Sequence, residues 1–416
     1  MMMKLHKLLT ALWSLTNHEN RKHFMFALRR YIDGVKQDQY LSTVSGSPYK
    51  VEAPYSGISP KILLVVPEYS NTGVPHAVLY LARALYILYG VKPVVIASKD
   101  GPLREEFEQE GCLAIVDPLL LNYSNYSSEA CNFIGRFDRV IVTSITSVNF
   151  IRYFRGIGKR LTWWLHEAET GFSATSDVNA DLQLMFASCD EIWLGSPLCK
   201  PFALQYTSQE KLHLLIYGCP DTALPHSPDK SGKMVFSIVG TVDLRKGQDI
   251  FLDAIGRLPE VLRKKAIFRI IGSPSPSHAG LAFYKQLCDA AAQIPEVVLT
   301  SSMPYERLQA FYAETDVFVC ASRDDPMPIV ITHGLMSSKA CLCSSAIGQA
   351  ELLADMKDGL IFTTESAEAL SKKIAWALQN PNELAALGMA GRAVYEKYFL
   401  MESFAQNVGY LLQDGR

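Results

Sequence analysis

The chain has 416 residues, of which 49% are hydrophobic and 20% charged, and a formal net charge of -2. This length exceeds one ordinary core, so we expect two domains. The near-neutral charge argues against nucleic acid as the main partner, and no run reaches the roughly 18 apolar residues of a membrane span. The nine cysteines include no Cys-x-x-Cys pair, which favours a reduced, cytoplasmic protein over a disulfide framework.

The first residues in chain order form a basic extension. Lysines and arginines outnumber acidic residues over positions 1–37, and leucines recur around Trp13 at roughly helical spacing. Such a basic amphipathic helix can lie on an anionic membrane surface, and a helix packed on its own domain explains the pattern equally well. The apolar part, 8–15, is short and no small-residue cleavage site follows, so we do not expect a signal peptide. Residues 38–60 are polar and turn-rich, which predicts a linker.

From residue 61 onward, short apolar runs alternate with amphipathic stretches. The first series predicts strands at 61–66, 93–97, 139–142, 161–165, 192–194 and 212–216, with helices such as 76–88 and 147–154 between them. Continuous apolar strands separated by helices indicate a parallel sheet covered on both faces.

A polar break at 220–233 ends the first series, and the alternation then restarts. The predicted strands are 234–239, 266–271, 296–299, 317–320, 340–343 and 360–362; the predicted helices are 248–258, 280–292, 305–314, 329–336, 367–378, 382–398 and 401–412. Two doubly wound domains joined by a short hinge bind ligands in a cleft at the facing carboxyl ends of their strands.

Residues 322–334 form the most informative segment of the second series. They join a predicted buried strand to a helix that begins near Ile329, with Asp325 at the turn and His333 on the helix. The N–H groups and the dipole of a helix N-terminus suit a diphosphate. An ordinary strand-to-helix turn with an N-capping Asp325 is the alternative.

Six short segments recur in an order that suggests a family. They are Asn71-Thr72-Gly73-Val74-Pro75, Trp163-Trp164-Leu165-His166-Glu167, Tyr217-Gly218-Cys219-Pro220-Asp221, Gly240-Thr241-Val242-Asp243-Leu244-Arg245-Lys246-Gly247, residues 322–334, and Gly348-Gln349-Ala350-Glu351. This series resembles family 4 of the retaining nucleotide-sugar glycosyltransferases, which have the two-domain α/β fold called GT-B. Each segment is weak alone, and the likeness runs from about residue 61 to the C-terminus.

The resemblance implies an organisation and an activity. It implies two Rossmann-like domains facing a cleft: an acceptor-binding domain at 61–225, a nucleotide-sugar-binding domain at 226–398, and a C-terminal helix at 399–416 that packs back on the first. The implied reaction moves a sugar, with retention, from a nucleoside-diphosphate sugar to a hydroxyl of a glycan or glycolipid, in bacterial-type surface polysaccharide assembly. Neither metal nor cofactor is expected, because family members neutralise the diphosphate with an Arg/Lys pair and helix-end amides.

The resemblance assigns the donor residues position by position. Lys246 matches the diphosphate-binding lysine, a fixed cation that stabilises charge on the departing phosphate. Thr241 stands where the family usually has an arginine, and Arg245 is the candidate for the second charge. Asp325 and His333 occupy the places of two glutamates, near the donor sugar and the ribose. A neutral imidazole can accept one ribose hydroxyl, whereas a carboxylate can accept two.

The remaining candidates lie around the expected cleft. His166 matches a histidine near the reacting carbon, so His166, Lys246 and Asp325 form the catalytic set, with a structural buried histidine as the alternative for His166. The acceptor set is Val74, Glu167 and Glu169. The further donor-binding residues are Gly73, Ser302, Met303, Met327, Ile329 and Glu351; a structural first-turn acid is the alternative for Glu351.

Other functions stay open on the sequence alone. A non-catalytic GT-B subunit that binds a sugar or a partner glycosyltransferase is supported by the departures at Thr241, Asp325 and His333. A nucleotide-sugar epimerase would need acid and base residues around the sugar. A two-domain solute-binding protein is disfavoured by the missing export signal. A peripheral site on the inner face of the plasma membrane, reached through the N-terminal helix, fits a lipid-linked acceptor.

Overall fold

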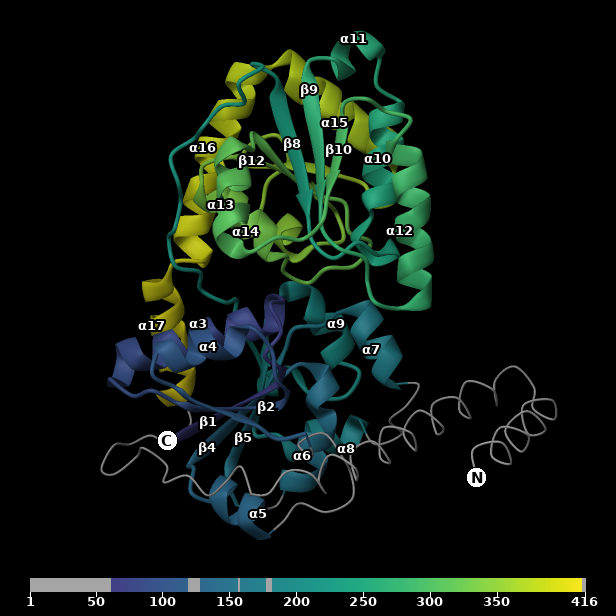
Figure 1. Ribbon diagram of the computed structural model, residues 1–416. Coiled ribbons are helices and arrows are strands. Elements are labelled where there is room, and N and C mark those ends of the chain that lie inside the picture. Colours follow the sequence, from purple (N-terminus) through teal and green to yellow (C-terminus); the bar gives the residue numbers. More distant parts are fainter. Residues whose placement is uncertain (1–60, 119–127, 156–157, 177–181, 414–416) are drawn as a thin grey trace, which may run out of the picture. The chain divides into compact units, whose positions relative to one another are not determined.

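The computed structural model describes residues 61–118, 128–155, 158–176 and 182–413. The extension and linker expected at 1–60 lie outside these residues. Two parallel sheets follow one another along the chain, the first coloured purple to teal and the second teal to green (Figure 1). No helix in the described part is long and apolar enough to cross a membrane.

The N-terminal half is built on a seven-stranded sheet in the order β3-β2-β1-β4-β5-β6-β7. Its strands are β1 (Ile62–Glu68), β2 (Val94–Lys99), β3 (Leu113–Val116), β4 (Arg139–Thr143), β5 (Arg160–Leu165), β6 (Glu191–Leu194) and β7 (Leu212–Leu214). Its helices are α3 (Gly73–Tyr89), α4 (Leu103–Gln109), α5 (Ser128–Ile134), α6 (Val148–Phe154), α7 (Glu169–Ser176), α8 (Leu182–Ser188) and α9 (Lys200–Ala203), with 3-10 turns η1 (Ile145–Ser147), η2 (Pro197–Cys199) and η3 (Gln209–Lys211). The apolar part of β1 is fully buried because both faces of the sheet are covered.

The C-terminal half repeats this architecture with six strands in the order β10-β9-β8-β11-β12-β13. Its strands are β8 (Met234–Val239), β9 (Ala266–Ile271), β10 (Val297–Thr300), β11 (Val317–Cys320), β12 (Ala340–Ser344) and β13 (Leu360–Phe362). Its helices are α10 (Gln248–Gly256), α11 (Glu260–Arg263), α12 (His278–Ala291), α13 (Tyr305–Glu314), α14 (Ile329–Met336), α15 (Ala367–Gln379), α16 (Pro381–Tyr398) and α17 (Met401–Gln413), with 3-10 turns η4 (Leu244–Lys246) and η5 (Gly348–Glu351).

The last helix confirms the expected crossing back to the first sheet. α17 packs along α3 (Figure 1). Their approach is close at Gly409, where an added Cβ would lie 3.1 Å from the Leu88 side chain. The segment that links the two halves is held by a hydrogen bond from α16, because the Tyr395 hydroxyl donates to the backbone oxygen of Cys219 at 2.8 Å. The GT-B arrangement expected from the sequence is therefore present.

Some elements of the N-terminal half were not predicted. β3 is only four residues long, and α4 has the sequence Leu-Arg-Glu-Glu-Phe-Glu-Gln, in which only Leu103 and Phe107 are buried. The α4 segment has too few apolar residues to show a helical period, whereas β3 is a short apolar run comparable with the strand predicted at 192–194. The strand expected at 93–97 also runs on to Lys99, and the helix expected at 248–258 ends at Gly256.

The strand order of the C-terminal half sets the position of the site. β8 lies between β9 and β11, so the connections leaving β8 and β11 go in different directions at their carboxyl ends. Ligands of such sheets bind at this switch point. β8 leads into η4, and β11 leads through residues 321–328 into α14, which brings the two candidate donor segments to one sheet edge.

Candidate functional site

Lys246 and Asp325 meet at the adjoining ends of β8 and β11. The Lys246 ammonium donates to Oδ2 of Asp325, and the two side chains are 23% and 11% exposed. The turn before them is shaped by Asp243, which accepts the Lys246 N–H at 3.1 Å, and by Gly247, whose φ is 70°. An added Cβ on Gly247 would lie 2.0 Å from the Ala321 carbonyl oxygen, so the turn needs glycine. The sequence-predicted cation and carboxylate are thus brought together.

Arg245 contacts the segment that follows β11. Its Nη1 donates to the backbone oxygen of Asp324 at 2.7 Å. A guanidinium has five N–H donors, so this bond leaves capacity for a phosphate. Arg323 makes a two-pronged pair with Asp249 at 3.0 and 2.8 Å and also donates to the Leu244 carbonyl oxygen, so its guanidinium is engaged within the protein. Arg245 therefore lies on the candidate donor loop, as expected, with a loop-bracing bond in addition.

The start of α14 carries no side-chain cap. Its N-cap residue is Pro328, and Asp325 contacts Lys246 instead, so the N-capping alternative for Asp325 is wrong. Gln349 fixes the turn from behind, because its Nε2 donates to the Pro328 carbonyl oxygen at 2.9 Å. The first-turn amides, including that of Ile329, lie at the sheet edge where Lys246 lies. Unsatisfied amides and a positive dipole end favour an anion there.

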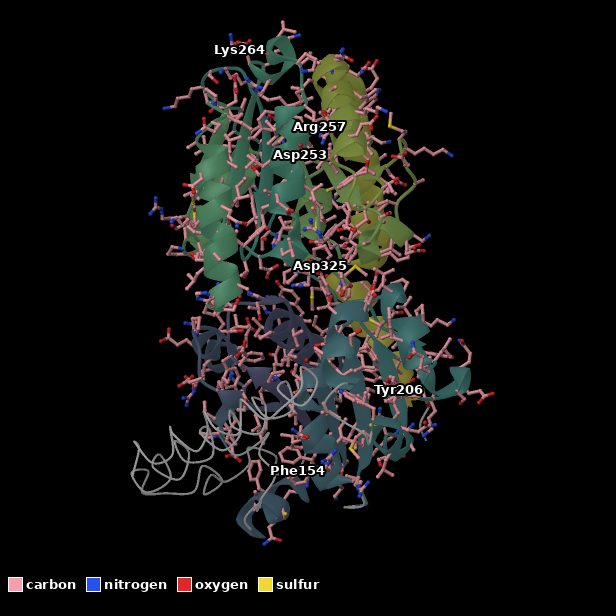
Figure 2. The ribbon with its side chains drawn as sticks, turned by 90° about the vertical axis from the view of Figure 1, so that its right-hand side faces the viewer. Phe154, Tyr206, Asp253, Arg257, Lys264 and Asp325 are labelled. Atoms are coloured by element: carbon pink, nitrogen blue, oxygen red, sulfur yellow. The ribbon has the colours of Figure 1, made fainter. Side chains whose placement is uncertain are left out.

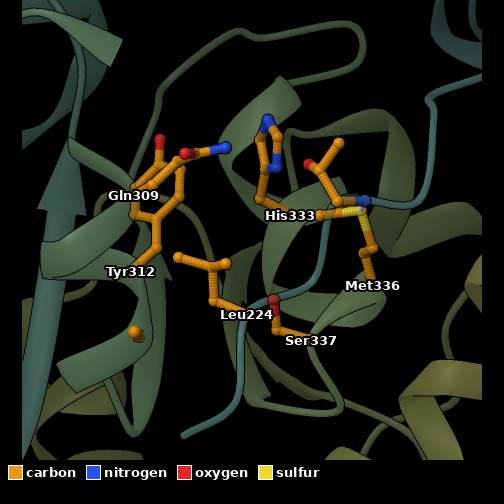
Figure 3. Close-up of a pocket in the computed structure, with 8 residues that line it drawn as sticks. Leu224, Gln309, Tyr312, His333, Met336 and Ser337 are labelled. Atoms are coloured by element: carbon orange, nitrogen blue, oxygen red, sulfur yellow. Dashed lines mark hydrogen bonds between the residues drawn. The ribbon is translucent and has the colours of Figure 1, made fainter. Parts of the chain in front are cut away.

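His333 lies in the second turn of α14 and is 4% exposed. Its ring centroid is 5.3 Å from that of Tyr312, and Figure 3 shows it between the Tyr312 and Met336 side chains. Burial, and then the nearby His76 of α3, lower the His333 pKa to about 4, so the ring is neutral at neutral pH. It lines a small pocket with Thr222, Leu224, Gln309, Tyr312, Ala313, Met336 and Ser337 (Figure 3).

His166 follows β5 in the N-terminal half. Its ring packs 4.4 Å from that of Trp164, and an added Cβ on Gly195 would lie 2.7 Å from Nδ1. Its Nε2 is enclosed and has no hydrogen-bond partner among the described residues. Burial lowers the His166 pKa to about 3, which keeps the imidazole neutral. A neutral ring with an unsatisfied Nε2 can accept or donate one hydrogen bond to a substrate, depending on its tautomer.

Glu167 points into its own half. Its carboxylate accepts from the Ser144 hydroxyl, from the Ile145 N–H at 2.9 Å and from the His166 N–H at 3.1 Å. Burial raises the Glu167 pKa in spite of these bonds. Ser144 has a φ of 67°, so the carboxylate stabilises an uncommon turn ahead of η1. The acceptor-binding role of Glu167 stays a prediction, and its hydrogen bonds to this turn give it a structural role as well.

The other acceptor candidates lie nearer the surface. Glu169 is exposed and opens α7, and Val74 is half-buried in the first turn of α3. Gly73 is exposed, and a Cβ there would meet nothing within 4 Å. A ligand can therefore approach the backbone at the start of α3.

The remaining donor candidates lie in loops of the C-terminal half. Ser302 is tied to the β9–α12 loop, because its N–H donates to Ser273 Oγ at 3.1 Å. Met303 and Met327 are half-buried, and the Met327 carbonyl accepts from the Tyr217 hydroxyl at 3.5 Å. Glu351 is exposed at the end of η5. Their contact with a donor stays a prediction.

Asp324 was not singled out by the sequence, yet it joins the two halves. Its Oδ2 accepts the N–H of Thr170, the second residue of α7, at 2.8 Å. A second bond across the halves joins the Tyr217 hydroxyl to Thr332 Oγ1 at 2.8 Å. The only signal in the sequence was the doubled aspartate at 324 and 325, of which the second matched the motif.

No group of three or more acidic, histidine or cysteine side chains in the described ranges could hold a metal ion. Metal independence remains a prediction for chelation to test.

Comparison with known proteins adds a family match over part of the chain. Residues 221–394 match the family model described as Glycosyl transferases group 1. A GDP-mannose-dependent alpha-(1-6)-phosphatidylinositol monomannoside mannosyltransferase of Mycolicibacterium smegmatis is 26% identical over 256 residues, which is 57% of this chain and 66% of that protein. The lipopolysaccharide core biosynthesis mannosyltransferase LpcC of Rhizobium leguminosarum bv. viciae is 24% identical over 209 residues, 47% of this chain and 58% of that protein. The chain thus spans less than two thirds of the length of these relatives.

Solved structures match over a longer stretch. Anabaena Alr3699/HepE in complex with UDP-glucose superposes with a TM-score of 0.72 and 15% identity, covering 85% of this chain and 99% of that one. Sucrose-phosphate synthase from Thermosynechococcus elongatus gives a TM-score of 0.66 with 16% identity, covering 85% and 98%. At such identities the likeness shows the fold, and it supports GT-B for the two sheets together.

Proposed function

We propose that this chain is a retaining glycosyltransferase that moves a sugar from a nucleoside-diphosphate sugar to a hydroxyl of a glycan or glycolipid. The observation that carries the proposal is the Lys246–Asp325 pair beside the uncapped start of α14. A cation and helix-end amides at one sheet edge form a diphosphate site. The match of residues 221–394 to the glycosyltransferase family model supports the same assignment.

The chemistry follows from where charge develops. As the bond between the sugar carbon and the diphosphate oxygen breaks, negative charge grows on that oxygen, where Lys246 and the α14 amides stabilise it. The acceptor oxygen forms the new bond to the sugar carbon on the same face. Its proton passes to the departing phosphate oxygen. We assign no side-chain nucleophile.

Asp325 and His166 bracket the sugar in this proposal. Asp325 accepts a sugar hydroxyl once the phosphate has taken over its partner Lys246. His166 offers a neutral Nε2 from the N-terminal half, because burial lowers its pKa to about 3. Neutral groups on the acceptor side do not compete with the cation for the diphosphate. The halves then act as the donor domain, 226–398, and the acceptor domain, 61–225.

We further propose a role in cell-envelope glycan or glycolipid assembly at the inner face of the plasma membrane. The two curated relatives are named as mannosyltransferases of phosphatidylinositol mannoside and lipopolysaccharide core synthesis. HepE was crystallised with UDP-glucose. GDP-mannose and UDP-glucose are therefore the first donors to test, and the reaction is expected to proceed without a metal.

A non-catalytic GT-B subunit is the second candidate. The observation in its favour is that His333 replaces the expected carboxylate and packs on Tyr312 with 4% exposure. Such a packed ring offers the ribose fewer contacts than a carboxylate.

Differential scanning fluorimetry with UDP, GDP, dTDP and ADP separates the two candidates. The proposed enzyme is stabilised by one nucleotide, and Lys246→Ala abolishes that shift. The matching sugar nucleotide then transfers sugar to a glycolipid acceptor, and NMR of the product shows the donor's anomeric configuration. No shift with any nucleotide at millimolar concentration, together with no transfer, would favour the non-catalytic subunit.

A further inference from the structure

Two aspartates stand side by side after β11, and they face different partners. Asp325 contacts Lys246 within the C-terminal half. Asp324 turns its carboxylate to the N-terminal half, where it accepts the Thr170 N–H at 2.8 Å. Figure 2 marks the place of this pair through Asp325. One residue of the pair therefore serves the donor site, and its neighbour reaches the acceptor half.

The bond to Thr170 completes the start of a helix. The first N–H groups of a helix have no partner inside it, and a carboxylate at that end is stabilised by the helix dipole. For α7 the carboxylate comes from a residue 154 positions further along the chain. The loop that leads into α7 begins at His166 and Glu167, directly after β5. Anchoring Thr170 therefore anchors the far end of the loop that carries His166.

The backbone of Asp324 is tied to the donor loop. Its carbonyl oxygen accepts from Arg245 Nη1 at 2.7 Å, and the Arg245 carbonyl oxygen accepts from the Arg323 N–H at 2.7 Å. These bonds join the segment after β11 to the turn that ends in Lys246. A displacement of Asp324 must therefore move either the Lys246 turn or the helix start at Thr170.

We propose that Asp324 is a positioning residue that couples the diphosphate-binding loop to the acceptor loop of the other half. The role rests on the proposed glycosyl transfer. With the bond made, His166 and Lys246 are held at one distance, and water is kept from the sugar during transfer. The nucleotide itself is bound within the C-terminal half, so its affinity does not depend on Asp324. A simple helix cap, by contrast, would contribute stability without changing the course of the reaction.

The test compares Asp324→Ala with Asp324→Asn, which keeps an oxygen acceptor. Asp253→Ala is the control, because Asp253 is an exposed carboxylate on α10 away from Asp325 (Figure 2). Hydrogen exchange is followed in the peptide containing Thr170. Transfer from UDP-glucose or GDP-mannose to octyl α-mannoside gives kcat and donor KM, and the reaction without acceptor gives the share of donor lost to hydrolysis.

For Asp324→Ala we expect faster exchange at Thr170, a fall in transfer kcat of about five- to tenfold, a donor KM within about twofold of wild type, and a larger hydrolysed share. Asp324→Asn restores part of the rate. Unchanged exchange, or a lower Tm with unchanged kcat and hydrolysis, would overturn the role. A wild-type chain that transfers sugar from neither donor and is stabilised by none of UDP, GDP, dTDP and ADP overturns the proposed function as well. An active wild type beside an equally active Asp324→Ala overturns only this role.

Discussion

The two halves of the chain are built alike but hold their candidate residues differently. In the C-terminal half, Lys246 and Asp325 point at each other from adjoining strand ends. In the N-terminal half, the Glu167 carboxylate accepts hydrogen bonds from backbone N–H groups of the same half. The His166 Nε2 has no hydrogen-bond partner in the described part of the chain. The paired cation and carboxylate thus lie in the C-terminal half, and the N-terminal half contributes the neutral His166 ring, with Glu169 as an exposed carboxylate at the start of α7.

This difference fits the division of labour that the proposal requires. Negative charge develops on the donor phosphate, so a fixed cation is useful on the donor side. A neutral histidine on the acceptor side can orient a hydroxyl without attracting the diphosphate. Nucleotide binding that depends on residues of the N-terminal half would therefore contradict this division of roles.

Removal of the cation has the largest expected effect. Lys246→Ala should lower kcat/KM for transfer by about a hundred- to a thousandfold, as for other groups that stabilise developing charge. It also leaves Asp325 without its partner, so the Tm of Lys246→Ala is measured beside its rate to separate a loss of stability from a loss of catalysis. Lys264→Ala is the matched control, because Lys264 is 65% exposed. A Lys246→Ala enzyme within threefold of wild type would refute the donor site.

Removal of the His166 ring should lower the rate of transfer without changing nucleotide binding. His166→Ala is expected to lower kcat by about ten- to a hundredfold, since a hydrogen bond near the reacting carbon is lost. The thermal shift produced by the nucleotide should persist, because the donor site lies in the other half. Loss of that shift in His166→Ala, in a variant that is otherwise folded, would contradict the division between the halves.

A variant of Glu167 tests whether its carboxylate stabilises the N-terminal half or binds the acceptor. Glu167→Gln keeps the shape but leaves one neutral acceptor oxygen where a carboxyl group now accepts three hydrogen bonds, so the free energy of unfolding should fall by about 1–2 kcal/mol in urea titrations. Glu169→Gln, at an exposed position in the first turn of α7, is the control and should lower stability less than Glu167→Gln does. A stable Glu167→Gln protein with a raised acceptor KM would instead favour the acceptor role that the sequence predicts.

A further expected effect is in the pH dependence of stability. The His333 pKa is lowered from 6.5 to about 4, by burial and then by His76. The unfolded chain binds the proton first on acidification, so this part of the stability is complete above pH 6.5 and is lost as the pH falls towards 4. In His333→Gln the free energy of unfolding should fall less steeply over this window, by about one proton. Equal slopes for both proteins would show that His333 is not buried as a neutral ring.

The sequence predicted the strongly apolar strands well. The strands at 234–239, 266–271 and 317–320 have the predicted bounds and are largely buried. The helices at 305–314 and 329–336 also have the predicted bounds, and both follow a proline that marks their start. α4 was missed because two apolar residues among charges do not make a recognisable period. β3 was also not predicted, although its four-residue apolar run is longer than the run predicted as a strand at 192–194. Local pattern thus predicts the buried apolar strands and misses a short helix such as α4, whose charged residues hide its two buried positions.

The site was predictable as a set of residues and less so as a set of contacts. Lys246 and Asp325 were both named, but they are 79 positions apart and meet only because β8 and β11 pair. The bond between Asp324 and Thr170 depends in addition on how the two halves meet, which no local pattern encodes. Glu167 was named for its charge, and its engagement with Ile145 was invisible before the fold was known.

The most direct test of the division between the halves is isothermal titration calorimetry of UDP and GDP against three proteins: wild type, Lys246→Ala and His166→Ala. The account predicts that one nucleotide binds wild type and His166→Ala with similar affinity, and that Lys246→Ala loses most of this affinity. Retained binding in Lys246→Ala together with lost binding in His166→Ala would contradict it.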